Sequence, residues 1–379
     1  MKAIINGRIV MPDGIVEGRA LVYEDRVLGM AEDVSGADEV IDAKGLYVIP
    51  GLFDVHTHGG VGVDISACTR GDVDRLSASK VTEGVTSYLP TTVTLSHEDL
   101  ACALERIRSA MNAAPAGARV WGANVEGPYL NPERKGAHDE ALIRPADPEF
   151  LLQYEDVVRI TTIAPEMPGN LDAIRALKGH IRVSLGHSAA SYEQANQGFN
   201  AGATEVTHLF NAMNGLHHRK PSLLGAALER DDVYAELICD TFHVHPALFK
   251  TVWRAKGDHL VLITDALCAA ALGDGSYLSG GLTYTVQGIK CLLPDGTIAG
   301  SILRLNKAVH NLMKYAGVPM HLAVNCASLH PARAMGMEKD VGSLLPGRLA
   351  DMAICDEEMN ICRTIVGGAC VYAARRSDI

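Results

Sequence analysis

Two histidines separated by one residue, His56 and His58, are the clearest sign of chemistry in this sequence. They end a short apolar run, and side chains alternate faces along a strand, so both imidazoles point to the same side. Divalent metals of borderline softness prefer such nitrogens together with a carboxylate. Taken with the four strand-end residues described next, the pair points to a hydrolase that activates water on a metal.

Four other apolar segments also end in a side chain that can bind or use a metal: Glu126, His187, His208 and Asp265. The Gly-Pro pair after Glu126 forces a sharp turn, which fixes the direction of the carboxylate. Each residue alone has an ordinary alternative. Glu126 could be a solvated loop carboxylate, a histidine could be a structural hydrogen-bonding residue, and Asp265 could be a helix N-cap. Together with the histidine pair, the set predicts a metal site.

The middle of the chain must position these residues, and it alternates short apolar strands with helical stretches. This alternation is typical of repeated βα units and a parallel sheet. Active sites of closed barrels lie at the C-terminal ends of the strands, where the candidate residues fall. We therefore predict an α/β protein with a (β/α)8 TIM-like barrel over residues 51–334. A Gly-rich stretch, 273–300, predicts a small β insertion. The expected strands are 51–58, 85–92, 119–126, 158–165, 182–187, 203–208, 235–240 and 259–265.

Both ends of the chain have a different pattern, in which short apolar runs alternate with turn signals. Asn6-Gly7 is an example near the start, and Gly367-Gly368 is one near the end. Such patterns predict small antiparallel strands. We expect the two ends to pair into one discontinuous β-sandwich domain formed by residues 1–50 and 335–379.

Composition excludes several classes of function. The formal charge of −11 disfavours a nucleic-acid or anionic-membrane surface, because the summed field repels polyanions. The nine cysteines are scattered, odd in number and without a Cys-x-x-Cys pair, which indicates reduced thiols rather than a disulfide framework. The start of the chain does not read as a signal peptide, and no apolar run approaches membrane-spanning length. We expect a cytoplasmic protein.

Six motifs carry a resemblance to a known family. Residues 50–60 resemble the first-strand motif of the amidohydrolase superfamily. Residues 342–351 resemble the segment with which the superfamily's chain returns into its β-sandwich domain. Three further pieces, Glu-Gly-Pro at 126–128, Gly-His-Ser at 186–188 and His-Leu-Phe-Asn-Ala-Met at 208–213, are similar to motifs of the N-acetylglucosamine-6-phosphate deacetylases, as is Thr-Asp-Ala at 264–266. The resemblance runs nearly the whole chain.

The resemblance implies that Glu126, His187 and His208 hold the main catalytic metal. Some members of the family lack the two first-strand histidines and carry one metal, whereas this chain has both. We therefore expect a second metal at His56 and His58, with Glu126 bridging, and thus one or two divalent metals per chain. Zinc, iron, manganese and cobalt suit these donors alike.

The resemblance also implies roles in catalysis and substrate binding. Asp265 would be the acid/base, and His243 would polarise the amide carbonyl. His138 would contact the sugar. The phosphate of the sugar would be received by Asn211, Ala212 and Arg219. Arg219 could act across a homodimer interface. From the sequence alone, Asn211 could equally be a loop hydrogen-bonder and Arg219 a surface cation.

The implied activity is removal of the acetyl group from N-acetylglucosamine 6-phosphate, giving glucosamine 6-phosphate and acetate. One alternative is the same chemistry on N-acetylgalactosamine 6-phosphate. The sugar preference stays open because the family pattern Asp-Gly-x-His is Asp-Thr-Phe-His at 240–243, and Asn124 replaces a frequent histidine. A second alternative is another binuclear amidohydrolase, but cyclic-amide hydrolases typically use a carbamylated lysine after the fourth strand, and 158–166 contains none. A non-catalytic relative would be expected to have lost ligands.

Overall fold

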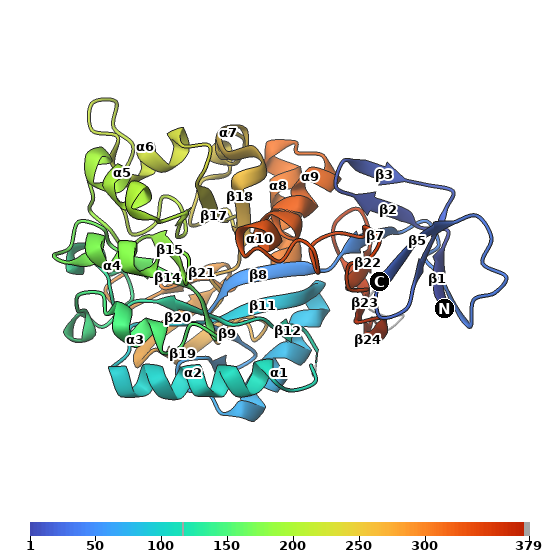
Figure 1. Cartoon of the computed structure of the whole chain (residues 1–379), viewed down its shortest axis with the longest axis horizontal. Coiled ribbons are helices and arrows are strands. Elements are labelled where there is room, and N and C mark those ends of the chain that lie inside the picture. The colour runs from blue at the N-terminus through green and yellow to red at the C-terminus, as the bar shows by residue number, and fades with distance from the viewer. Residues whose placement is uncertain (116, 375–379) are drawn as a thin grey trace.

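The computed structural model describes residues 1–115 and 117–374 and has a broad part and a narrow part (Figure 1). The first and the last described strands both lie in the narrow part. The broad part contains the parallel strands and the helices around them. Among the described residues, no helix is long and apolar enough to cross a membrane.

The broad part is a parallel barrel, and its fold confirms the predicted class. In the sheet order, β8 pairs with β11, and the remaining strands follow in sequence to β18. The ends meet where the Asp265 N–H donates to the His56 carbonyl at 2.9 Å, and the His58 N–H donates to the Ala266 carbonyl at 2.9 Å. The strands are β8 (Leu52–Thr57), β11 (Val85–Thr92), β12 (Arg119–Val120), β13 (Ala123–Glu126), β14 (Val158–Ile163), β15 (Arg182–Leu185), β16 (Glu205–Val206), β17 (Tyr234–Ile238) and β18 (Leu260–Ile263).

Most of the observed strands end a residue or two before the predicted bound, and two of the expected strands differ further. The segment 119–126 is divided into β12 and β13, with Gly122 at φ +149° between them. Arg159 and Val157 crowd the place where a side chain on Gly122 would stand, so only glycine fits there. The segment 203–208 contains only the short strand β16, and His208 lies beyond its end.

Helices surround the barrel and bury their apolar faces on it. The helix α2, for example, buries Leu100, Ala103, Leu104 and Ile107, and its N-cap Ser96 accepts a hydrogen bond from the Asp99 N–H. The α-helices are α1 (Arg70–Lys80), α2 (His97–Met111), α3 (Pro148–Leu152), α4 (Asn170–Leu177), α5 (Tyr192–Ala201), α6 (Ser222–Glu229), α7 (Phe249–Lys256), α8 (Leu305–Ala316), α9 (Met320–Cys326) and α10 (Leu329–Ala334). Short 3-10 helices lie at Val81–Glu83, Pro132–Arg134, Glu140–Leu142, Pro246–Leu248 and Gly257–His259.

The narrow part consists of two sheets that share an apolar core. The first sheet has the order β5-β4-β1-β6, and the second has the order β24-β23-β22-β7-β2-β3. The two chain ends pair where β7 runs antiparallel to β22, and Ile4, Val48 and Met352 are buried in the shared core. The strands are β1 (Lys2–Ile5), β2 (Arg8–Met11), β3 (Gly14–Val16), β4 (Ala20–Tyr23), β5 (Val27–Ala31), β6 (Glu39–Asp42), β7 (Tyr47–Pro50), β22 (Met352–Cys355), β23 (Ile361–Val366) and β24 (Ala369–Ala373). The domain boundaries stay predictions, and residues 375–379 lie outside the described residues.

A small antiparallel sheet follows the last barrel strand, as expected for the Gly-rich stretch. It comprises β19 (Gly275–Ser279), β20 (Leu282–Gln287) and β21 (Lys290–Leu292). Asp64 fastens it to the hairpin of β9 (Gly59–Gly60) and β10 (Val63–Asp64), accepting hydrogen bonds from the Ser279 hydroxyl and the Gly280 N–H. The insertion therefore stands over the C-terminal ends of the strands.

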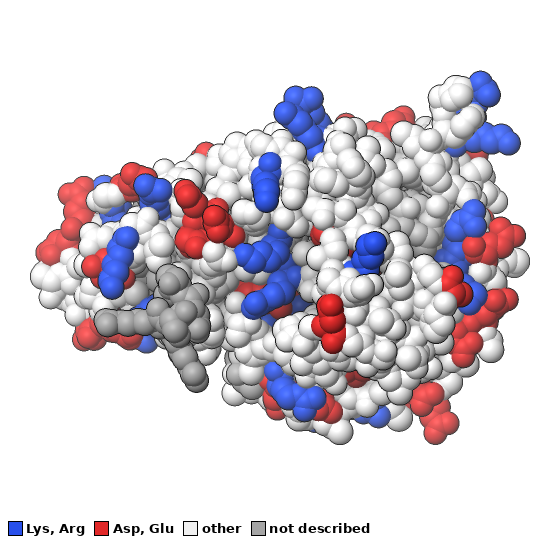
Figure 2. All heavy atoms as spheres, turned by 180° about the vertical axis from the view of Figure 1, so that it is seen from behind, with Lys and Arg blue, Asp and Glu red and all other residues white. Residues whose placement is uncertain are grey.

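Charges of both signs are interspersed on the face of the molecule seen in Figure 2, apart from a group of Lys and Arg near its middle. Acidic side chains lie close to many of the basic ones on that face. This face therefore does not present one uniform basic surface of the kind that tracks a nucleic-acid backbone.

Candidate metal centre

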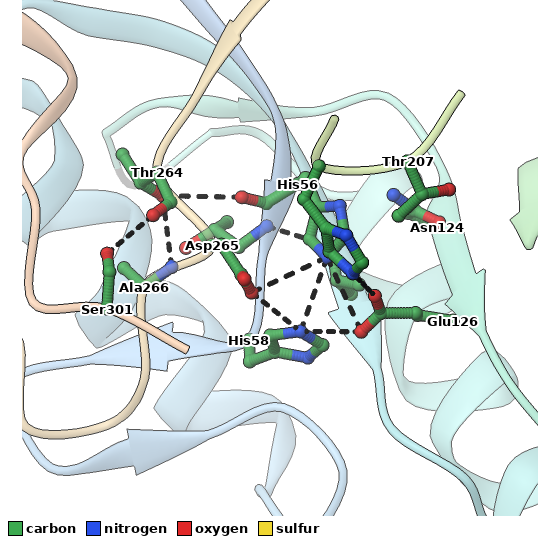
Figure 3. Close-up of polar contacts among 12 residues, drawn as sticks. His56, His58, Asn124, Glu126, Thr207, Thr264, Asp265, Ala266 and Ser301 are labelled. Atoms are coloured by element: carbon green, nitrogen blue, oxygen red, sulfur yellow. Dashed lines mark hydrogen bonds and ion pairs between the residues drawn. The ribbon is translucent and has the colours of Figure 1, made fainter. Parts of the chain in front are cut away.

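The carboxylate of Glu126 lies at the centre of the site, at the end of β13 and facing a cavity of about 300 Å³. Its Oε1 is 3.1 Å from His187 Nε2 and 2.9 Å from His208 Nε2. Its Oε2 is 3.0 Å from His58 Nε2 and 3.5 Å from His56 Nε2 (Figure 3). One carboxylate thus stands between two groups of histidines, with one oxygen directed at each group.

The site contains two sets of metal-binding atoms, which we call the loop cluster and the strand cluster. The loop cluster is Glu126, His187 and His208, and the strand cluster is His56, His58 and Asp265; within each, the ligand atoms lie within 4.8 Å of one another. The nitrogen–nitrogen distances are 3.0 Å in the loop cluster and 3.3 Å in the strand cluster. Ligands about 2.1 Å from one tetrahedral ion lie roughly 3.4 Å apart. Both donor sets therefore fit a divalent metal.

The two histidines of the loop cluster stand on backbone that turns sharply after a strand. His187 has φ +47° after β15, and His208 has φ +30° after β16. These left-handed conformations cost of the order of 1–3 kcal/mol each for a non-glycine residue and persist only where the surroundings hold them. The turns direct both imidazoles into the cavity. His56 and His58, by contrast, point the same way because side chains alternate along β8 and the residue after it.

Buried acceptors fix the orientation of two imidazole rings. His56 Nδ1 donates to Glu236 Oε2 at 2.9 Å, and His187 Nδ1 donates to the Arg134 carbonyl at 2.8 Å. Each ring therefore keeps its Nε2 lone pair for a metal. Glu236 Oε2 also accepts the His208 N–H at 3.0 Å, so one carboxylate holds a residue of each cluster. Glu236 was not among the predicted site residues, although a glutamate inside the apolar strand β17 is a signal that could have pointed to it.

Acidic and basic side chains lie close together in the site and shift one another's pKa values. Burial alone would raise the pKa of Glu126, but the surrounding histidines, His56 first among them, hold it well below its usual range. Burial also opposes ionisation of Asp265, yet His58 and His56 lower its pKa to about 2. Burial lowers the pKa of His187 to about 4. Both carboxylates are consequently ionised at neutral pH, as metal binding and proton acceptance require.

Asp265 joins the strand cluster and does not cap a helix. Its Oδ1 is 3.2 Å from His58 Nε2 and 3.6 Å from His56 Nε2. Its backbone turns with φ +51°, and no helix starts after it in the described part of the chain before α8 (Figure 3). The helix N-cap alternative is therefore wrong. The carboxylate instead faces the same cavity as Glu126.

His243 lines the cavity from the loop after β17. Its Nδ1 is 2.6 Å from Asp240 Oδ2, while Asp240 Oδ1 accepts the backbone N–H groups of Phe242 and His243 at 2.8 Å each. Thr241 has φ +72°, a conformation that favours glycine. The backbone at the threonine that replaces the family's glycine thus adopts the left-handed conformation, and the histidine still reaches the cavity.

The candidate substrate residues divide into two groups. His138, Asn211 and Ala212 line the cavity, and His138 Nε2 is 3.4 Å from Glu126 Oε2. Arg219 does not line it. Its side chain is exposed, contacts His218 Nε2 at 2.7 Å and borders a separate groove on the outside. Within one chain, the structure therefore brings every predicted residue except Arg219 to one site.

A glutamate beyond the end of β14, Glu166, was not among the predicted site residues. Its carboxylate binds Asn131, Ser188 and Ala189 rather than the histidines. The carboxylate between the two clusters comes from Glu126, as the sequence indicated.

Comparisons with known proteins agree with this geometry. The sequence model of the amidohydrolase family matches residues 47–371. An N-acetylgalactosamine-6-phosphate deacetylase of Escherichia coli O157:H7 is 37% identical, with 95% of this chain and 97% of the relative covered. An N-acetylglucosamine-6-phosphate deacetylase of Bacillus subtilis (strain 168) is 36% identical, with 87% and 86% covered.

A solved structure gives the same result. A mutant N-acetyl-D-glucosamine-6-phosphate deacetylase from Mycobacterium smegmatis, in complex with N-acetyl-D-glucosamine-6-phosphate, superposes with a TM-score of 0.91 at 30% identity. The alignment covers 98% of this chain and 99% of that one. With a family match over most of its length and these relatives over nearly all of it, the chain belongs to the amidohydrolase family and, within it, to the N-acetylhexosamine-6-phosphate deacetylases.

Proposed function

We propose that this protein is a metal-dependent hydrolase that removes the acetyl group from N-acetylglucosamine 6-phosphate, giving glucosamine 6-phosphate and acetate. The observation that carries the proposal is the position of Glu126 between two histidine clusters, with Asp265 and His243 on the same cavity. The M. smegmatis relative was solved with this phosphorylated sugar bound, which supports the substrate class.

The loop cluster would hold one divalent metal, and His56 and His58 would hold a second, with Glu126 serving both. Bound there, the metal supplies a water whose pKa is lowered towards about 7 and a Lewis acid for the amide carbonyl. Glu126 and the histidines orient the reactants by fixing the ligand positions. Zinc, iron, manganese and cobalt all suit these donors.

Asp265 would act as the acid/base. Its carboxylate is ionised because neighbouring His58 and His56 lower its pKa to about 2 despite burial. It can therefore accept a proton from the attacking water and pass it to the sugar nitrogen as the C–N bond breaks. This transfer lets glucosamine 6-phosphate leave as the amine.

His243 would stabilise the charge that develops on the carbonyl oxygen. His243 Nδ1 donates to Asp240 Oδ2 at 2.6 Å, which orients the ring. When the imidazole carries a proton on both nitrogens, its Nε2–H would donate to the oxygen as it becomes negative, and this stabilisation is largest in the transition state.

The sugar and its phosphate would be held at the cavity wall. His138 would contact the sugar, and Asn211 and Ala212 would receive the phosphate. Because Arg219 lies outside the cavity of its own chain, we propose that it reaches the phosphate bound by the partner in a homodimer. Charge-assisted contacts of this kind favour a phosphate over a neutral hydroxyl. Nine free cysteines support a cytoplasmic location.

The second candidate substrate is N-acetylgalactosamine 6-phosphate. The E. coli relative with that name is 37% identical over 366 residues, against 36% over 340 for the B. subtilis relative. These values differ too little to choose between the sugars, which differ only in the configuration of one hydroxyl.

The test is an assay of acetate release by the metal-loaded protein on both phosphorylated sugars and on N-acetylglucosamine. We expect the highest kcat/KM on N-acetylglucosamine 6-phosphate and a much lower value without the phosphate. If kcat/KM is higher on N-acetylgalactosamine 6-phosphate, that sugar is the substrate instead of N-acetylglucosamine 6-phosphate. Activity on neither would refute the proposed function.

A further inference from the structure

Glu166 joins two loops of the site without touching any candidate ligand side chain. The residue follows β14, and its Oε1 accepts hydrogen bonds from Asn131 Nδ2 at 2.8 Å and from the Ala189 N–H at 2.6 Å. Its Oε2 accepts the Ser188 hydroxyl at 2.7 Å. All three partners are donors, so an ionised carboxylate satisfies each of them, and such charge-assisted bonds are roughly twice as strong as neutral ones.

The loops held by Glu166 are those that fix the metal ligand His187. The Asn131 N–H donates to the His187 carbonyl at 3.0 Å, and His187 Nδ1 donates to the carbonyl of Arg134 at 2.8 Å. His187 is therefore bracketed by residues 131–134, while Glu166 binds both that segment and the two residues that follow the ligand. The φ of +47° at His187 needs such support, because it is unfavourable in isolation.

The same contacts continue to the loop proposed to receive the phosphate. The Ser188 N–H donates to the Ala212 carbonyl at 3.1 Å, and Asn214 Nδ2 donates to the Ala189 carbonyl at 2.9 Å. Ala212 also has a left-handed backbone, with φ +50°. Residues 188–189 thus bind Glu166 on one side and the loop 212–214 on the other.

We propose that Glu166 is a positioning residue that sets two parts of the site together, the metal ligand His187 and the substrate loop at Ala212. Its effect on the metal is independent of which substrate the protein uses. Its effect on the phosphate rests on the proposed function.

Zinc binding by metal-free protein tests the first part. Glu166→Ala removes all three acceptors, and we expect the affinity for the first equivalent of zinc to fall about tenfold, the lower end for residues that orient a ligand. Glu166→Gln keeps one acceptor oxygen and nearly the same shape, so its loss should be smaller. A positioning role predicts this order, with a larger loss of zinc affinity in Glu166→Ala than in Glu166→Gln.

Asp356 offers a matched control. It also accepts three hydrogen bonds, from the Glu358 N–H, the Asn360 N–H and Asn360 Nδ2, but it lies between β22 and β23, away from the metal centre. Asp356→Ala should lower the melting temperature without changing the affinity for zinc. A purely structural Glu166 would behave in the same way.

Inorganic phosphate tests the second part. Because the loop at Ala212 is held through Ser188 and Ala189, Glu166→Ala should raise the KM for the phosphorylated sugar and weaken competitive inhibition by phosphate, each several-fold, beyond any fall in kcat. With metal at saturation, the effect on phosphate inhibition should remain.

Two results overturn the proposal, and they differ from failure of the proposed function. If Glu166→Ala and Glu166→Gln both bind zinc as tightly as the wild type, Glu166 does not position His187. If phosphate inhibition is unchanged at saturating metal, it does not position the substrate loop. If the wild type binds zinc but hydrolyses neither sugar phosphate, the proposed function fails, while the zinc comparison still decides the role of Glu166 toward the ligand.

Discussion

The histidines of the strand cluster and those of the loop cluster all lie beside Glu126, but the two pairs are built in different ways. His56 and His58 come from β8 and the residue after it, so the alternation of one strand brings them together. His187 and His208 stand on left-handed residues of two separate loops. The first arrangement follows from local strand geometry, whereas the second also needs contacts between loops, such as that of Glu166. Glu236 holds one histidine of each pair.

The difference suggests how each cluster responds to mutation. Ligands on a strand are held by many backbone hydrogen bonds, so removing one distant contact changes them little. Ligands on strained loops keep their positions only while several separate contacts hold the backbone, so they are sensitive to residues that bind no metal.

The largest expected effect concerns Asp265, which lies in the strand cluster but is proposed to move a proton. Asp265→Asn should keep the metals and lose turnover by roughly 10²–10⁴-fold, the usual range for a general acid/base. Metal analysis and kcat on the same preparation check this. If the variant loses a metal, Asp265 is chiefly a ligand, and the strand cluster is a three-residue site.

The second prediction removes the strand cluster. His56→Gln combined with His58→Asn should reduce the metal content from two equivalents to one, because the loop cluster has its own ligands. Elemental analysis after metal loading measures this. A control is His330→Gln, a buried histidine whose Nδ1 binds the Leu260 carbonyl away from the site. A wild type that holds one equivalent, unchanged in the double variant, would refute the second metal.

The third prediction compares metal-free and metal-loaded protein as the pH rises. Burial lowers the pKa of His58, but Asp265 and Glu126 more than offset this and raise it from 6.5 to about 9. A raised folded-state pKa contributes stability that is fully present below the unfolded value of 6.5 and is lost as the pH rises through about 9. At about 1.4 kcal/mol per pKa unit, the loss is of the order of 3 kcal/mol.

Bound metal should abolish this dependence, because a coordinated histidine has already lost its proton. Urea unfolding across this pH window, with and without metal, gives the measurement. Equal pH dependence in the two forms would mean that His58 does not bind the metal.

The smallest effect is expected at Arg219, which belongs to neither cluster. Arg219→Ala should lose about 1.5–3 kcal/mol of binding, the range for hydrogen bonds to a charged group. This corresponds to a roughly ten- to hundredfold fall in kcat/KM on the phosphorylated sugar, seen mostly in KM. The neighbouring cation Lys220 is a matched control, because it borders the same groove. Equal losses on phosphorylated and unphosphorylated substrate would rule out phosphate recognition.

Mixed dimers decide which subunit Arg219 serves. Combining Arg219→Ala chains with Asp265→Asn chains creates some sites with both wild-type residues only if the arginine acts across the interface. Activity should then rise above that of either parent. No rise in verified mixed dimers would place Arg219 in the site of its own chain.

The sequence by itself determined the barrel, the paired chain ends and the segments that carry the candidate ligands. Strand periodicity is local, and the C-terminal ends of parallel strands must meet at one face, so the convergence of residues as distant as His56 and Asp265 could be predicted. The small β insertion was visible for the same reason, because turn residues mark it locally.

Only the tertiary structure decided how the ligands are held. Nothing near Glu166 or Glu236 in sequence shows that their carboxylates bind loops 23 and 28 residues away, because such contacts depend on the packing of neighbouring strands. The left-handed turns at His187 and His208 are equally invisible locally, since only a few per cent of non-glycine residues adopt them. The exclusion of Arg219 from its own cavity likewise follows from the path of a loop, which its local sequence does not specify.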